Sequence, residues 1–175
     1  LFIAGWMTSF SRNNLKRAAV YGAAALAVFL TTTLTDLTTP INFGILYCMA
    51  ACTLVFCAVR PALAACGSPL LPVALIALFL ALNNVHHQAY PVPYLAWLGF
   101  PDAAFSSGDY YPLVPYAFLY LAFAWLGVRV RHYPAWMRRD YCRPLTVIGK
   151  HSLLIYLAHQ VVIVIGFELA LLALG

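Results

Sequence analysis

Long apolar runs separated by short polar segments dominate the pattern of this chain. Runs at residues 18–34, 43–59, 68–85 and 112–128 approach the ~20 residues that a helix needs to cross a bilayer, and residues 144–172 contain another. Residues 1–10 are typical of the end of a further helix. The pattern therefore predicts an all-α fold: a polytopic transmembrane helical bundle with five full spans and the end of a sixth at the N-terminus.

The start of the chain bears on its domain organisation. The first residue is leucine, and no basic region or small-residue cleavage site of a signal peptide precedes the first apolar run. We therefore expect a single transmembrane domain over residues 1–175 that is N-terminally incomplete.

The positions of the charged residues test this span count. The basic residues are Arg12, Lys16, Arg17, Arg60, Arg129, Arg131, Arg138, Arg139, Arg143 and Lys150. With strictly alternating spans, all of them lie on one side, and Asp36, Asp102 and Asp109 lie on the other. The positive-inside rule makes the basic side cytoplasmic and places the loop of residues 83–111 outside. The net charge of +5 then follows from topology and needs no nucleic-acid partner.

Composition supports a membrane location. The chain is 64% apolar and 9% charged, whereas soluble domains are about half apolar and a quarter charged. Its principal surroundings are therefore membrane lipid. The five cysteines contain no CxxC pair, and the adjacent His86 and His87 have no suitably spaced acidic or cysteine partner, so we expect neither a disulfide framework nor a metal site.

The last apolar segment carries a polar stripe. Ser152, Tyr156 and His159 are spaced to share one helix face, and Gln160 follows directly. His159 lies eight residues beyond His151, about 12 Å deeper at ~1.5 Å per residue. Such groups either make hydrogen bonds between helices or line a functional cavity.

Two outer segments offer further candidates. Asp109 precedes the run at residues 112–128, where an aspartate either caps free backbone N–H groups or acts as a general base at the mouth of a cavity. Asn42 and Gly44 precede the run at residues 43–59. They indicate either a turn with a close glycine contact or a polar part of the same site.

Four segments, taken together, resemble one known family. "LFIAGWMTSFSRNNLKRA", "NFGILYCMA", "GDYYPLVPYAFLYLAF" and "IGKHSLLIYLAHQVV" occur in the order found in bacterial membrane proteins similar to the heparan-α-glucosaminide N-acetyltransferase catalytic domain. The resemblance covers nearly the whole chain. It departs from the family at the N-terminus, where an opening arginine- and aspartate-containing segment and a helix followed by a histidine are missing. Lys150 and Tyr47 also stand where the family often has Arg and His.

The resemblance implies an acyltransferase that takes an acyl group from acetyl-CoA or another acyl-CoA on the cytoplasmic side. The acceptor is a sugar amine or hydroxyl of a cell-surface glycan or precursor. The implied catalytic residues are Asp109 and His159. The implied substrate-binding residues are Asn42, Tyr110, Ser152, Tyr156 and Gln160, and the implied donor-binding residues are Arg17, Lys150 and His151. The resemblance also favours the bacterial inner membrane, and a homo-oligomer is possible.

A second function class stays open. The same polar stripe could belong to a non-enzymatic carrier, transporter or assembly subunit. Transporters often contain internal repeats, and the sequence shows none.

Overall fold

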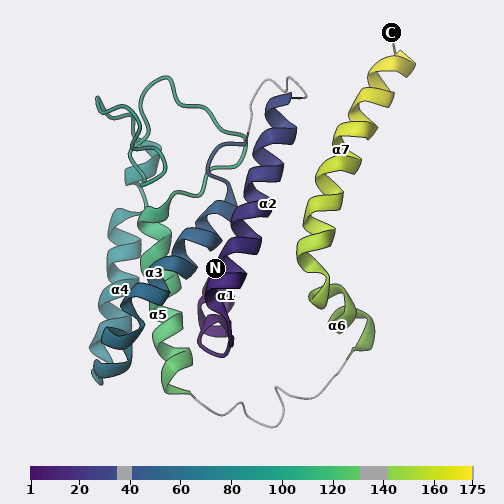
Figure 1. Ribbon diagram of the computed structural model, residues 1–175. Helices are drawn as coiled ribbons and strands as arrows, with labels where there is room; N and C mark the ends of the chain where they lie inside the picture. Colours follow the sequence, from purple (N-terminus) through teal and green to yellow (C-terminus); the bar gives the residue numbers. More distant parts are fainter. Residues whose placement is uncertain (35–40, 131–141, 175) are drawn as a thin grey trace. The chain divides into compact units, whose positions relative to one another are not determined.

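The computed structural model describes residues 1–34, 41–130 and 142–174, and all regular structure in these ranges is helical (Figure 1). The chain forms two compact units, Leu1–Arg131 and His132–Gly175. The helices of the first unit are α1 (Phe2–Thr8), α2 (Asn14–Leu34), α3 (Ile45–Ala65), α4 (Leu70–Leu82), the 3₁₀ turn η1 (Val85–His87) and α5 (Leu113–Arg129). The second unit contains α6 (Arg143–Lys150) and α7 (Ser152–Leu174).

The helices confirm the all-α fold and an integral membrane protein. Within the described ranges, three helical segments are long and apolar enough to cross a membrane: Asn14–Leu34, Ile45–Ala65 and Leu70–His87. Helix α5 has 17 residues and is slightly short by the same measure. The count of five full spans therefore stays a prediction.

The core of the first unit lies between α3 and α5. Cys48, Cys52 and Phe56 of α3 pack against Tyr120 and Ala124 of α5, and all five are 0% exposed. Helices α1 and α4 also pack on α5, while α2 packs on α3. Helix α5 is thus the central element of this unit.

Glycines allow α1 to approach α5 closely. A Cβ atom at Gly5 would overlap the backbone of Tyr120, and one at Gly127 would overlap Trp6 and Ser9. Small residues at such crossings bring membrane helices together without a hydrophobic driving force.

A buried cluster of hydroxyl groups joins three helices. The Tyr120 hydroxyl contacts the hydroxyls of Thr8 and Thr53, with a 3.0 Å distance to Thr53. Each threonine hydroxyl also donates to a carbonyl four residues earlier in its own helix, at 2.7 Å. These bonds satisfy polar groups that lipid or a dry core would leave unpaired.

The first unit separates its charges between two ends. The connection from α1 to α2, the connection from α3 to α4 and the C-terminus of α5 lie at the lower end of Figure 1. The loop from α4 to α5, which contains Asp102 and Asp109, lies at the opposite end. At the lower end, the Trp125 indole donates to the Cys66 carbonyl at 2.8 Å, and Arg129 donates to the same oxygen. Side chains of α5 thereby cap the C-terminus of α3.

The second unit contains a break that the apolar pattern does not show. The run at residues 144–172 is expected to contain one helix, but α6 ends at Lys150 and α7 begins at Ser152. Between them His151 has φ −104° and ψ 14°. Its N–H donates to Val147 of α6, and its carbonyl accepts from Ile155 of α7 at 2.9 Å. His151 is therefore the C-cap of α6, and its carbonyl makes a hydrogen bond within the first turn of α7.

Candidate functional site

Asp109 lies at the N-terminus of α3. Its Oδ2 atom accepts a hydrogen bond from the Ile45 N–H at 3.1 Å, and a Cβ atom at Gly44 would lie 2.8 Å from the same oxygen. The capping alternative is therefore correct in kind, but the capped helix is α3 and not the helix that follows Asp109. The α5 N-cap is Pro112, which makes no side-chain capping bond. A carboxylate at a helix N-terminus is stabilised by the free N–H groups and the helix dipole.

Asn42 is tied to the same loop. Its N–H donates to Ser107 Oγ at 2.9 Å, and its side-chain amide donates to the Ser106 carbonyl at 3.2 Å. Ser107 Oγ also lies 2.7 Å from the Asn42 carbonyl oxygen and 2.8 Å from that of Asp109. The structure thus brings Asn42 and Asp109 together, although 66 residues separate the segments in the sequence. The sequence predicts a close contact of Gly44 with another helix. In the structure the close contact is with the Asp109 carboxylate instead.

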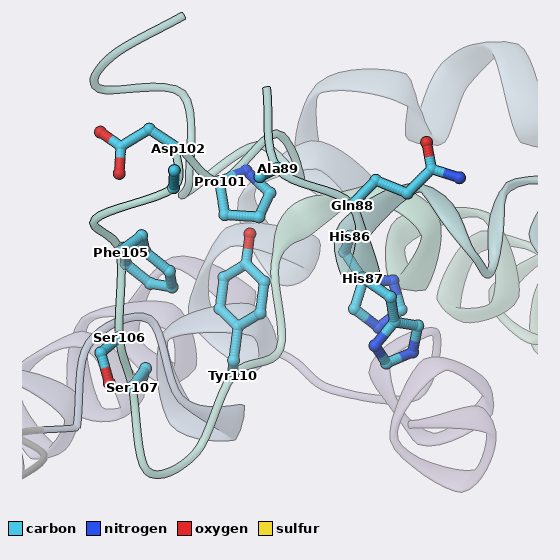
Figure 2. Close-up of a pocket in the computed structure, with 11 residues that line it drawn as sticks. His86, His87, Gln88, Ala89, Pro101, Asp102, Phe105, Ser106, Ser107 and Tyr110 are labelled. Carbon is cyan, nitrogen blue, oxygen red and sulfur yellow. The ribbon is translucent and has the colours of Figure 1, made fainter. Parts of the chain in front are cut away.

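Tyr110 lines an open pocket of about 400 Å³ beside this junction (Figure 2). Its hydroxyl donates to the Ala96 carbonyl at 2.6 Å, and burial raises the pKa of Tyr110 to about 12. The hydroxyl therefore stays protonated at neutral pH and holds the ring in place. Tyr110 therefore lines the pocket mainly with its aromatic ring, because its hydroxyl proton is already donated to the Ala96 carbonyl.

Two loop segments supply the other walls of this pocket. His86, at the centre of η1, forms one wall with His87, and residues 101–107 form the other with Asp102, Phe105 and Ser106. His86 is only 6% exposed, and its Nδ1 atom has no hydrogen-bond partner among the described residues. A buried polar atom left unpaired costs roughly 1–3 kcal/mol.

The second unit contains the predicted histidine. His159 Nδ1 is hydrogen-bonded to the Tyr156 carbonyl, and the two rings lie 5.1 Å apart. Because a carbonyl accepts only from an N–H, this bond places the ring proton on Nδ1 and leaves Nε2 as the basic nitrogen. The His159 side chain is exposed in this unit.

The remaining predicted residues of this unit lie on α6, α7 and the break between them. Lys150 is the last residue of α6, His151 occupies the break and Ser152 begins α7; all three are exposed. Gln160 belongs to α7, but its side chain lies outside the described part of the structure.

Arg17 lies in the first turn of α2, near the N-terminus of that helix. Its Nε donates to the Tyr21 hydroxyl at 3.2 Å, and its guanidinium lies 5.5 Å from the centre of the Tyr21 ring. Arg17 is half-buried, and Arg12 and Lys16 precede it at the same end of the unit. That position is compatible with a phosphate contact.

Metal binding finds no support in the geometry. No group of three His, Cys, Asp or Glu side chains within the described ranges is arranged to hold an ion.

Sequence reasoning did not identify the pocket. The resemblance includes Tyr110 among the substrate-binding residues, whereas the sequence marks His86 only as a poor candidate metal ligand and does not mark Phe105 or Ser106. No local pattern marks these residues as neighbours, because a loop fold brings η1 to residues 101–107. The adjacent pair of His86 and His87 was the one visible signal.

Comparison with protein families gives a single strong finding. The family model of the heparan-alpha-glucosaminide N-acetyltransferase catalytic domain matches residues 1–161. Comparisons with curated proteins and with solved structures gave no match. The matched region includes the first unit and the second unit up to the first half of α7, and with them Asp109 and the whole polar stripe. The chain therefore belongs to the heparan-alpha-glucosaminide N-acetyltransferase catalytic-domain family, and this membership together with its long apolar helices indicates a membrane acyltransferase.

Proposed function

We propose that this protein transfers an acetyl or similar acyl group from a coenzyme A thioester on the cytoplasmic side to a sugar amine or hydroxyl on the other side. The observation that carries the proposal is the family match over residues 1–161. The inner membrane of a bacterium is the proposed location, with the basic loops cytoplasmic and the loop of residues 83–111 outside.

His159 is the proposed general base. Its Nδ1 is held by the Tyr156 carbonyl, which leaves Nε2 to remove a proton from the acceptor amine or hydroxyl. The acceptor nitrogen or oxygen then forms a bond to the thioester carbonyl carbon. The carbon–sulfur bond breaks, and coenzyme A leaves as its thiol after it takes up a proton. Ser152, Tyr156 and Gln160 are the proposed polar groups around the developing oxyanion.

The other candidates have separate proposed roles. Asp109 is the proposed second catalytic group, with Asn42 and Tyr110 contacting the acceptor on the outer side. Arg17, Lys150 and His151 are the proposed contacts of the donor phosphates and pantetheine on the basic side. The whole chain acts as one transmembrane domain in this proposal.

The test of His159 uses the protein reconstituted in lipid. His159→Ala should lower acyl transfer at least ~100-fold, because general acid–base catalysis contributes ~10²–10⁴-fold. Leu154→Ala is the matched control, since Leu154 is an exposed apolar residue of the same helix. Wild-type turnover by His159→Ala, in protein that inserts normally, would remove His159 from the mechanism.

A binding measurement separates this function from transport. Coenzyme A should raise the thermal unfolding temperature of the purified wild-type protein, because it binds only the folded state. If coenzyme A produced no shift and proteoliposomes accumulated a solute instead, the acyltransferase proposal would be wrong and a carrier role would replace it.

A further inference from the structure

We propose that α6 is an interfacial helix that lies on the membrane surface beside α7 and binds the headgroups of anionic phospholipids. Its apolar face enters the boundary between headgroups and acyl chains, and its basic side chains stay among the headgroups. The inference concerns the second unit alone. It is independent of the proposed acyltransferase function, because lipid binding by α6 needs neither an acyl donor nor an acceptor.

The eight residues of α6 divide into an apolar and a polar face. At about 100° per residue, Leu145 and Ile148 lie on one side of the helix, and the other side carries Arg143, Thr146 and Lys150. Leu145 is 66% exposed and Ile148 is 52% exposed, and no residue of α6 is buried in the described part of the structure. A short two-sided helix of this kind, with basic residues on its polar face, is typical of helices that lie in the plane of a membrane surface.

Helix α6 is joined directly to the predicted last span. Helix α7 has 23 residues and is about 35 Å long at ~1.5 Å per residue, which is enough for the ~30 Å hydrocarbon core of a bilayer. Only His151 separates the two helices, and Figure 1 shows α6 turned away from the axis of α7. With α7 as a span, α6 is held at the level of the headgroups, where lipid is available to cover its apolar face.

The charge of α6 determines which lipid it prefers. Its first and last residues are basic, and it contains no acidic residue. The predicted sidedness places α6 at the cytoplasmic surface, where anionic lipids create a negative potential. Each basic residue near such a surface strengthens binding roughly fivefold. The apolar face alone would accept any lipid, and the basic residues add the preference for anionic headgroups.

The combination of the two faces favours a lipid over a soluble phosphate compound. Both carry the phosphate oxygens that Arg143 can bind. A soluble phosphate compound, however, would leave Leu145 and Ile148 exposed to water, whereas a phospholipid surface covers them while its headgroups meet the basic side chains.

Spin labelling measures the depth of each face in the full-length protein reconstituted in vesicles. The starting protein has serine in place of the cysteines that are not buried, which are Cys57, Cys66 and Cys142. A nitroxide is attached either through Ile148→Cys on the apolar face or through Thr146→Cys on the polar face, about 160° away. In vesicles of two parts phosphatidylcholine to one part phosphatidylglycerol, the label at position 148 should collide mainly with oxygen, which concentrates in lipid. The label at position 146 should collide mainly with a water-soluble nickel complex.

Two substitutions test the charge and the apolar face, through the ratio of lipid-inserted to aqueous label at position 148. Arg143→Gln should lower this ratio about fivefold in the mixed vesicles and leave it unchanged in phosphatidylcholine alone. Leu145→Gln should lower it at least about tenfold in both, because an apolar side chain is replaced by a polar one. Thr146→Ser, on the polar face, is the matched control and should change neither ratio. Thermal unfolding of each variant checks that the fold is retained.

The outcomes decide between lipid and protein as the cover of this face. Insertion at position 148 that is stronger in the mixed vesicles, and that weakens in Arg143→Gln and Leu145→Gln, supports the proposal. Equal insertion in the two lipid compositions, or an aqueous label at both positions, overturns it. A label at position 148 that neither oxygen nor the nickel complex reaches also overturns it, because protein then covers the face.

Discussion

At the scale of single residues, Asp109 combines a structural contact with a proposed catalytic role. Its carboxylate caps α3 through the Ile45 N–H, and Gly44 leaves the space for it. The Asn42 contacts to Ser106 and Ser107 hold the same loop against the start of α3. Loss of activity on removal of Asp109 would therefore not by itself distinguish catalysis from folding.

A pair of substitutions at Asp109 separates the two roles. Asp109→Ala should lower the free energy of unfolding by ~0.5–2 kcal/mol, the usual cost of losing an N-cap. Asp109→Asn keeps a capping oxygen and should unfold near the wild-type temperature. If Asp109 is catalytic, acyl transfer by Asp109→Asn should fall ~100-fold. Both activity and thermal unfolding are measured on the same preparations.

An Asp109→Asn protein with wild-type turnover would restrict Asp109 to the cap.

At the scale of helices, the crossing of α1 with α5 depends on glycine. The backbone of Tyr120 occupies the space that a side chain at Gly5 would need. The nearby hydroxyl cluster of Thr8, Tyr120 and Thr53 spans the same contact and extends it to α3. Displacement of α1 would therefore disturb both the packing and these hydrogen bonds.

Gly5→Ala should destabilise the protein by ~1–3 kcal/mol, the typical cost of overpacking, because the obstructing atoms belong to backbone. Thermal unfolding in a fixed lipid or detergent provides the measurement. Gly22→Ala is the matched control: no atom lies within 4 Å of a Cβ there, and alanine favours a helix by up to ~1 kcal/mol over glycine. Equal effects of the two substitutions would show that the α1–α5 contact does not limit stability.

The helix boundaries differ in two places from those that the apolar pattern of the sequence predicts. The expected run at residues 43–59 extends in the structure to Ala65, because Pro61 is accommodated inside α3. The run at residues 68–85 divides into α4 and η1. α3, α4 and η1 all contact α5, so these boundaries lie in a packed region that the local pattern does not describe.

At the scale of the whole molecule, sidedness is the main prediction from charge. The described basic residues of the first unit occupy the end opposite the loop that contains Asp102 and Asp109. The positive-inside rule then predicts that Cys142, which lies among the basic residues before α6, faces the cytoplasm.

Labelling of intact cells with a membrane-impermeant maleimide tests this topology. Ser106→Cys adds an exposed thiol to the outer loop and should react in intact cells. Cys142, which is exposed, should react only after permeabilisation, and Cys142→Ser identifies its signal. Reaction of Cys142 in intact cells, or protection of the Ser106→Cys thiol, would contradict the predicted sidedness.

The sequence by itself determined the helical class, the apolar segments, the division of charge and the family, because run length, charge and linear motifs are local properties. It also selected Asn42, Asp109 and Tyr110, which the fold places in one loop region, and Tyr156 with His159, which contact each other. The tertiary structure alone decided that Asp109 caps α3, that Gly5 meets the backbone of Tyr120, and that His86 and Asp102 share a pocket. Each of these contacts joins separate elements, so its geometry depends on how helices and loops pack, which no local pattern records.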